Sequence, residues 1–218
     1  MACRQFGVVV TTSLLDGTTV HIRPLDAKDK DDLQAGVRRM SAASRYRRFF
    51  SPIDELSEAQ LRWFTEIDYH DHFAWVAYVE GIGPERPGIG VARYVRLRER
   101  PDAAEFAVGV IDEYQGHGVG TLLLGAVVIA AAANDVRFAV GEVLRENQPM
   151  LRLAAHYGAA PHASDPGEVT VELDIPTLAA GLQGEPWDDL RRAVAEIRAG
   201  GGGIEPPTSG SKVRRSAN

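Results

Sequence analysis

Residues 104–121 read AEFAVGVIDEYQGHGVGT, and this stretch decides the fold. Its first part is apolar apart from Glu105 and predicts a strand, after which glycines at 116, 118 and 120 lead into an uncharged helix over 119–133. Glycine lets a backbone approach an anion closely, and the free N–H groups at a helix N-terminus attract negative charge. The stretch therefore predicts a phosphate-binding turn, and a turn that needs glycine for its geometry alone stays open as the alternative.

Two other phosphate-binding motifs are excluded by the residues present. A P-loop needs a Gly-Lys pair followed by Ser or Thr, and the chain contains no Gly-Lys pair. The dinucleotide-binding fingerprint needs a glycine where the chain has Thr121, and it usually opens a fold instead of falling midway along the chain.

Strands and helices alternate around this turn. Runs of β-branched and aromatic residues predict further strands at 8–13, 18–23, 73–80, 89–97, 136–144 and 168–175. Apolar spacing and capping signals predict further helices within 26–50 and at 58–66 and 146–157, and glycines and prolines predict a loop at 81–88. The strand, helix and strand over 104–144 follow one another directly, so they predict a β-α-β unit and an α/β (α+β) fold class.

The composition is that of an ordinary globular protein of 218 residues, 44% hydrophobic and 25% charged. A net charge of −6 gives duplex nucleic acid no long-range attraction, so no nucleic-acid partner is expected. Cys3 is the single cysteine, which argues against a disulfide or a cysteine-rich metal site and indicates a cytoplasmic location. The first residues lack a signal-peptide pattern, and the uncharged stretch 118–133 is shorter than the roughly 20 apolar residues of a spanning helix, so no membrane association is expected.

We divide the chain into an N-terminal extension or first strand (1–17), a main domain (18–176), a C-terminal helical extension (177–199) and a disordered tail (200–218). The extension holds an amphipathic helix between Trp187 and Arg198, which either docks on the domain or pairs with a second copy. A monomer and a homodimer therefore both stay open. The tail starts with four glycines and continues with prolines and serines, which bury too little apolar surface to order a chain.

Two motifs carry a resemblance to the GNAT family of N-acetyltransferases. The stretch QGHGVG at 115–120 is similar to the family's acetyl-CoA loop, Gln/Arg-x-x-Gly-x-Gly/Ala. The stretch NQPMLRL at 147–153, followed by Gly158, resembles a second family motif, Asn-x-x-Ala/Met-x-x-Leu with a later glycine. The resemblance covers about 18–175 and implies an N-acetyltransferase domain with the GNAT fold. That fold is a mixed, mostly antiparallel sheet flanked by helices, with a β-bulge or splay near Val110 where the pantetheine arm of acetyl-CoA lies between two strands.

Within the family, the chain most resembles bacterial protein lysine acetyltransferases of the Pat type. The likeness lies in SRYRRFF at 44–50, FTEIDY at 64–69 and AEF at 104–106. It implies acetyl transfer from acetyl-CoA, as co-substrate and without a metal, by direct attack of the ε-amine of a lysine on a protein substrate. Acyl-CoA synthetases and other metabolic enzymes are the candidate protein partners.

Such a transfer needs a neutral amine, whereas a free lysine with a pKa of about 10.4 is almost fully protonated at pH 7. Glu105 is the candidate general base, because it lies in an otherwise apolar strand where desolvation raises the pKa of a carboxyl group, and the Pat resemblance places the base there. The alternative is a strand carboxylate that pairs across to Arg93 or Arg96.

The resemblance also assigns residues to the two substrates. It places acetyl-CoA against Val108, Val110, Gln115, Gly116, His117, Gly118, Val119, Gly120, Thr121, Asn147 and Met150. It places the acceptor against Arg45, Tyr46, Asp68 and Tyr69. His117 departs from the Arg or Lys common at its position. Ala154 stands where many family members have a tyrosine that acts as general acid, and Tyr157 is almost one helical turn further on.

Several other interpretations stay open at this stage. Arginines and aromatics alternate within 44–50 and could form a nucleic-acid surface. Core aromatics explain the pattern better, with the arginines on a solvated face or, as the family resemblance implies, at the rim of the acceptor cleft. His70, Asp71 and His72 could belong to a metal site, but the two histidines lack a third ligand that can be predicted, and a surface turn is favoured. The function could also be acetylation of a small amine, or acetyl-CoA sensing without catalysis, which the presence of Glu105 disfavours.

Overall fold

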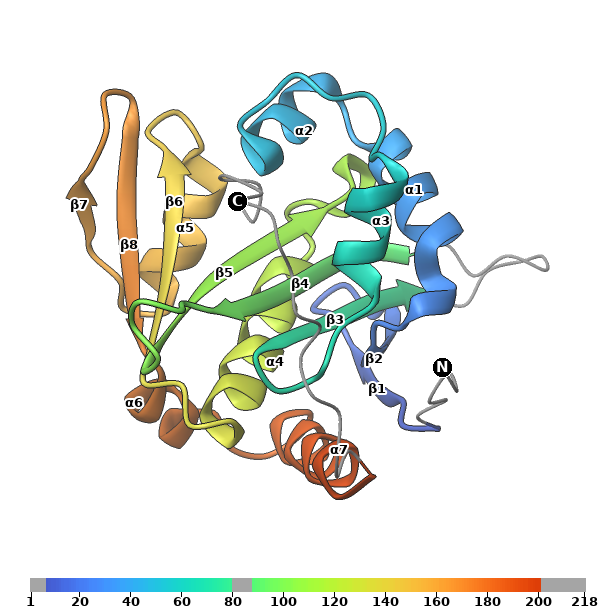
Figure 1. Cartoon of the computed structure of the whole chain (residues 1–218). Helices are drawn as coiled ribbons and strands as arrows, with labels where there is room; N and C mark the ends of the chain where they lie inside the picture. Colours follow the sequence, from blue (N-terminus) through green and yellow to red (C-terminus); the bar gives the residue numbers. More distant parts are fainter. Residues whose placement is uncertain (1–6, 80–87, 201–218) are drawn as a thin grey trace.

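The computed structural model describes residues 7–79 and 88–200, which form one sheet with helices on both faces (Figure 1). Its strands are β1 (Val10–Ser13), β2 (Thr19–Pro24), β3 (His72–Val79), β4 (Gly88–Arg96), β5 (Ala103–Val110), β6 (Phe138–Leu144), β7 (Pro161–Ala163) and β8 (Glu168–Asp174). Its helices are η1 (Ala27–Asp29), α1 (Lys30–Arg39), α2 (Ala42–Phe49), α3 (Glu58–Thr65), η2 (Asp112–Tyr114), α4 (Val119–Ala133), α5 (Gln148–His156), α6 (Ile175–Gly181) and α7 (Trp187–Gly200). The loop expected at 81–88 and the tail expected at 200–218 fall almost entirely outside the described residues.

Helices and turns with strong local signals form where the sequence predicts them. Helix α4 has the predicted bounds. Before α3, the hydroxyl of Ser57 accepts from the N–H of Gln60, and the Gln60 side chain accepts from the N–H of Ser57 at 2.8 Å, which completes a capping box. Between β1 and β2, Asp16 accepts from the N–H of Thr18 at 2.9 Å, and Gly17 has a φ of 86° that suits glycine.

The sheet has the order β1-β2-β3-β4-β5-β6-β8-β7, and all neighbours are antiparallel except β5 and β6. The β-α-β unit is confirmed, but its two strands pair only from Ala103 opposite Phe138 to Glu105 opposite Val140. The strands therefore part well before Val110, where the sequence had placed the splay. Just past the last pair, the ring of Phe106 lies against Gly141, where a Cβ would be 2.9 Å from a ring carbon, so only glycine leaves room for the ring.

The two faces of the sheet carry different layers (Figure 1). Helix α4 packs on β3, β4 and β5 and is itself covered by α6 and α7. Helices α1 and α2 lie over β4 and β5 on the other face, and α3 packs against α1. Within residues 7–79 and 88–200, no helix combines the length and the apolarity needed to cross a membrane.

The C-terminal segment adds elements that sequence reasoning missed. Strand β7 consists of three exposed residues, and α6 begins directly after β8, where Asp174 caps it by accepting from the N–H of Thr177 at 3.0 Å. Helix α7 docks on α4 of its own chain with its apolar side buried. Its Trp187 fits only because residue 125 of α4 is glycine, since a Cβ there would lie 2.5 Å from the indole and 2.8 Å from the hydroxyl of Tyr157.

We therefore expect Gly125→Ala to lower the free energy of unfolding by about 1–3 kcal/mol, because overpacking must displace either the indole or the helix. Urea denaturation measures this change. Gly36→Ala is the matched control: Gly36 is also helical, but no atom lies within 4 Å of its Cβ position, so alanine there should leave stability unchanged or raise it by about 0.5–1 kcal/mol. Equal effects of the two substitutions would contradict the tight contact with Trp187.

Candidate active site

A cleft of about 450 Å³ runs along the end of β5, from Val108 onward, between α2 and α5 to the N-terminus of α4. Its lining includes nearly all residues that the sequence had assigned to acetyl-CoA: Val108, Val110, Gln115, Gly116, Gly118, Gly120, Thr121, Asn147 and Met150. The other two residues that the sequence had assigned to acetyl-CoA do not line the cleft. Val119 is fully buried in the core, and His117 contacts the β1–β2 turn.

The glycine turn leaves backbone groups exposed to this cleft. Gly116 and Gly118 have φ values of 81° and 91°, and no atom lies within 4 Å of either Cβ position. Gly118 is the N-cap of α4, and no side chain caps the helix there. The first N–H groups of α4 therefore have no side-chain acceptor, and an anionic group fits this end of the cleft.

Gln115 and Asp112 tie this turn to helix α2. The Gln115 side chain donates to the backbone oxygen of Val110 at 3.0 Å and to the hydroxyl of Ser44 at 3.2 Å. Asp112 accepts from the N–H and hydroxyl of Ser41 at 2.9 and 2.7 Å and from the hydroxyl of Ser44 at 2.9 Å. The side-chain amide of Gln115 thus fixes the turn against α2 and the end of β5, and the backbone of Gln115 is the part that faces the cleft.

His117 is engaged at the rim of the molecule. Its Nδ1 lies 2.8 Å from a carboxylate oxygen of Asp16. Hydrogen bonds from His117 and from Thr18 lower the pKa of Asp16 to about 2. The imidazole therefore links the glycine turn to the β1–β2 turn.

Glu105 is the last residue of β5 that pairs with β6. Burial raises the pKa of its carboxyl group, the charge of Arg48 opposes that rise, and the charge of Glu142 adds to it. Within the described residues its carboxylate forms no hydrogen bond or close ion pair. The strand pairing considered from sequence is absent, because Arg93 donates to the backbone oxygen of Phe64 at 3.0 Å and to His72, and Arg96 is bound to Asp71.

Arg48 is a site residue to which sequence reasoning assigned no individual role, beyond grouping it with the arginines of a solvated face or of the acceptor rim. Its stem passes over β5 at Gly109, where a Cβ would lie 3.6 Å from Cδ, and its guanidinium lies 5.0 Å from the ring centre of Phe49 and 6.0 Å from that of Phe64. Burial lowers its pKa to about 10, and the charge of Glu105 opposes that fall. The signal that could have found it is helical spacing, because Arg48 follows the buried Ser44 by four residues and shares its face of α2.

The four residues assigned to the acceptor are not brought together at the cleft. Arg45 forms an ion pair with Asp54 and donates to two backbone oxygens, and Tyr46 is 44% exposed. Asp68 accepts from three backbone N–H groups of the turn that follows it, and Tyr69 donates to the backbone oxygen of Leu25 at 3.0 Å. Their polar groups thus stabilise loops, and none of them lines the cleft or the cavity beside it.

The basic and histidine-containing segments also have internal partners. Arg38 pairs with Glu55 and Arg39 with Glu113, so these arginines are not a free cationic surface. In the possible metal segment, His70 lies 2.8 Å from Asp71, whereas His72 is turned inward and accepts from Arg93 at 2.9 Å. Burial, together with the charge of Arg93, holds the pKa of His72 well below its usual value, so the imidazole stays neutral.

Helix α5 supplies the last wall of the cleft. Asn147 is its N-cap and accepts from the N–H of Met150 at 3.3 Å. Ala154, at the position of the family's tyrosine, is buried, and the hydroxyl of Tyr157 donates to the backbone oxygen of Thr121 at 2.6 Å. Burial raises the pKa of Tyr157 further above its usual value, so this phenol is a structural tie between α5 and α4.

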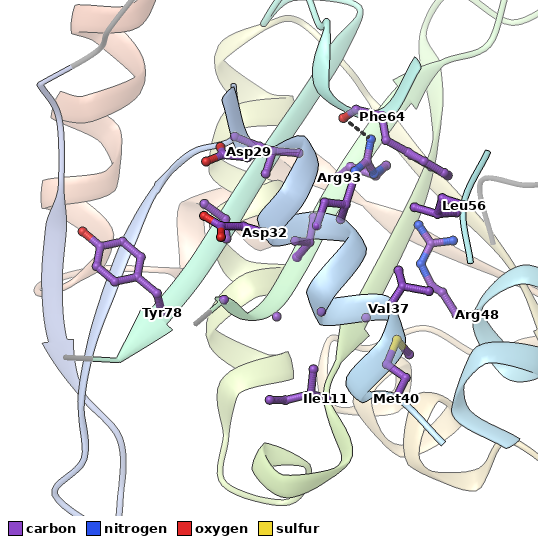
Figure 2. A pocket seen from close by; sticks show the side chains of 18 of the residues that line it. Asp29, Asp32, Val37, Met40, Arg48, Leu56, Phe64, Tyr78, Arg93 and Ile111 are labelled. Atoms are coloured by element: carbon purple, nitrogen blue, oxygen red, sulfur yellow. Dashed lines mark hydrogen bonds between the residues drawn. The ribbon is translucent and has the colours of Figure 1, made fainter. Parts of the chain in front are cut away.

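A second cavity of about 370 Å³ lies beside the cleft, between α1 and the sheet (Figure 2). The side chains around it come from α1, from the segment 48–64 and from β2, β3, β4 and β5. Met40, Arg48 and Gly109 line this cavity and also the cleft. Nothing in the sequence patterns had indicated it, because its walls are distant in the chain.

Comparisons with known proteins agree with this geometry. The model of the acetyltransferase (GNAT) domain matches residues 19–160. The acetyltransferase Pat of Mycolicibacterium smegmatis is 32% identical over 182 residues, which cover 83% of this chain and 54% of that protein. An acetyltransferase of Pseudomonas aeruginosa is 37% identical over 125 residues, or 57% of this chain and 66% of that protein. The chain thus spans about half the length of the first relative and about two thirds of the second.

Solved structures share the fold. The GNAT domain of S. lividans PAT has a TM-score of 0.71 and 30% identity, with 76% of this chain and 96% of that chain covered. The cAMP-binding acyltransferase from Mycobacterium smegmatis has a TM-score of 0.63 and 27% identity, with 90% of this chain and 56% of that chain covered. Since a domain model, sequence identity and a solved fold all agree, the chain belongs to the GNAT family of acetyltransferases.

Proposed function

We propose that this chain is a cytoplasmic protein lysine acetyltransferase that binds acetyl-CoA in the cleft between β5 and β6. Membership of the GNAT family supports acetyl transfer, and the similarity to Pat proteins supports a lysine of another protein as the acceptor. The observation that carries the proposal is Glu105, whose carboxylate has no hydrogen bond or close ion pair among the described residues and which lies at the point where β5 and β6 separate.

The described residues fit acetyl-CoA along the whole cleft. The uncapped N-terminus of α4 and the glycines before it suit the pyrophosphate. Beyond Glu105, the edge of β5 that faces β6 has no strand partner among the described residues, so backbone groups of Val108 and the N–H of Val110 can hold the pantetheine arm, whereas the oxygen of Val110 accepts from Gln115. Acetyl-CoA, when bound, supplies an acetyl group activated as a thioester.

The role proposed for Glu105 is to remove a proton from the acceptor lysine. A lysine ammonium must lose its proton before its nitrogen can form an amide, and a carboxylate with a raised pKa accepts that proton more readily than an exposed one. The charge of Arg48 opposes this rise in the pKa of Glu105 and so favours the ionised carboxylate, which is the form that accepts a proton. Neither Ala154 nor the bound hydroxyl of Tyr157 offers an acid, so we expect the departing thiolate to take its proton from solvent.

Glu105→Gln should lower kcat about 10²- to 10⁴-fold, because the amide cannot accept the proton. Binding of acetyl-CoA, followed by calorimetry, should stay within about threefold, since the cleft keeps its shape. The assay is transfer of labelled acetyl from acetyl-CoA to deacetylated bacterial lysate proteins and to purified acyl-CoA synthetases. Glu172→Gln, on the exposed side of β8, is the control and should keep full activity.

An unchanged rate for Glu105→Gln would refute its role as base. If the protein binds acetyl-CoA and acetylates small amines but labels no protein, the acceptor is a small amine and not a protein lysine. Binding without transfer to any acceptor would favour a sensor.

The acid side of the pH profile should depend on Arg48. Activity rises with pH as Glu105 loses its proton, and removal of the nearby positive charge raises the pKa of that carboxyl group. We therefore expect Arg48→Met to move the acid limb of kcat/KM to higher pH, whereas Arg48→Lys, which keeps the charge, moves it less. If the midpoint is the same in all three proteins, Arg48 does not act on Glu105.

Gly118→Ala should weaken acetyl-CoA binding about tenfold or more, because a Cβ costs about 1–2 kcal/mol in the left-handed conformation and shifts the N–H groups of the turn. Gly167→Ala is the matched control. Gly167 has a φ of 86° and open space around its Cβ position, but it precedes β8, away from the cleft. The control should lose similar stability and bind acetyl-CoA normally, so equal loss of binding in both would point to general destabilisation.

A further inference from the structure

The cavity between α1 and the sheet is an apolar chamber that the proposed acetyl transfer does not use. Apolar side chains form much of its wall, with Val37 on α1, Met40 directly after that helix, and Leu56 and Phe64 opposite (Figure 2). Its volume of about 370 Å³ is far more than an acetyl methyl group needs. A chamber of this kind gains free energy when it encloses an apolar ligand.

The chamber lies directly beside the acetyl-CoA cleft. Met40, Arg48 and Gly109 line both spaces and form the wall between them. Beyond Glu105, the face of β5 toward α2 carries only the small residues Ala107 and Gly109, and the stem of Arg48 lies on Gly109. The flexible side chain of Arg48 is therefore the part of the wall that an acyl chain must displace to reach the chamber from the parted strands.

The chamber has two carboxylates, Asp29 and Asp32, at its far end and two guanidinium groups near the cleft. Asp29 forms an ion pair with Arg23 at 2.6 Å and accepts from the N–H of Asp26 at 2.8 Å. Near the cleft, the guanidinium of Arg93 lies 4.4 Å from the ring centre of Phe64, close to Arg48. Two buried guanidinium groups disfavour a cationic amine at this end, so a neutral aliphatic chain suits the chamber better than the acceptor does.

We infer that the chamber receives the aliphatic chain of acyl-CoA donors longer than acetyl-CoA, so that the enzyme also transfers these acyl groups. This inference rests on the proposed function. In the transfer, the thioester C–S bond breaks and an amide C–N bond forms. The lysine ammonium gives one proton to Glu105 before the attack, its nitrogen loses a second proton to solvent as the amide forms, and the CoA thiolate takes a proton from solvent. No further reactant is needed, because the acyl carbonyl group is the same as in acetyl transfer.

The experiment measures dissociation constants of CoA, acetyl-, butyryl-, hexanoyl- and octanoyl-CoA by calorimetry, and kcat/KM for transfer to one protein acceptor, with the whole chain. We expect affinity to rise about threefold to fourfold for each added methylene group over the shorter donors, the factor that corresponds to ~0.8 kcal/mol per buried CH₂.

Gly36→Leu tests the chamber directly. Gly36 lines the chamber within α1, and no atom lies within 4 Å of its Cβ position, so leucine is accommodated and favours the helix. This variant should lower the ratio of the affinity for hexanoyl-CoA to the affinity for acetyl-CoA at least tenfold. The affinity for acetyl-CoA itself should stay within twofold of the wild type. Val37→Phe, at the next position of α1 along the chamber wall, should act in the same direction, and Gly36→Ala should keep most of the wild-type preference.

Three results would overturn the inference. Affinity in the wild type that is flat or falls with chain length would show that the chamber stays closed to donors. A Gly36→Leu variant that raises the KM of the acceptor equally with every donor would assign the chamber to the acceptor. Failure of the wild type to bind even acetyl-CoA would refute the proposed function itself, and the inference with it.

Discussion

The incomplete pairing of β5 with β6 is the constraint on which the rest of the site depends. Helix α4 forces these strands to run parallel, yet they pair only as far as Glu105 and Val140. Beyond that point the ring of Phe106, packed against Gly141, takes the space beside the strand. One strand edge is left without a strand partner in the described chain, and a cleft lined by Val108 and Val110 opens along it, a short way beyond Glu105. In a fully paired sheet the same residues would have no room for a thioester.

Helix α2 is the second element on which the site depends, because it connects the glycine turn to the charged residues proposed for proton transfer. Its N-terminus is held by Asp112, which follows β5, and its Ser44 receives the amide of Gln115 from the turn itself. One helical turn later, Arg48 lies between the cleft and the chamber and acts on the charge of Glu105. The anion-binding end and the reacting end of the cleft are thereby linked through one short helix.

Several residues that carry suitable chemistry prove to have structural roles. Asp68, Tyr69 and Arg45 use their polar groups on backbone atoms, and His117 contacts Asp16. A buried or half-buried polar group must find a partner inside the protein. Residue type alone therefore does not distinguish a residue that binds substrate from one that stabilises a loop. Glu105 differs from them because its carboxylate is partly buried and has no such partner in the described chain.

Sequence alone determined the features that depend on near neighbours. The capping box at Ser57, the bounds of α4 and the glycine turn follow from local backbone preferences, and the same turn identified the family. Tertiary structure decided where β5 and β6 separate, where α7 docks, and that Arg48 and α1 enclose a chamber beside the cleft. Those features arise from packing between residues far apart in the chain, such as Phe106 with Gly141 and Trp187 with Gly125, and no local pattern encodes such contacts.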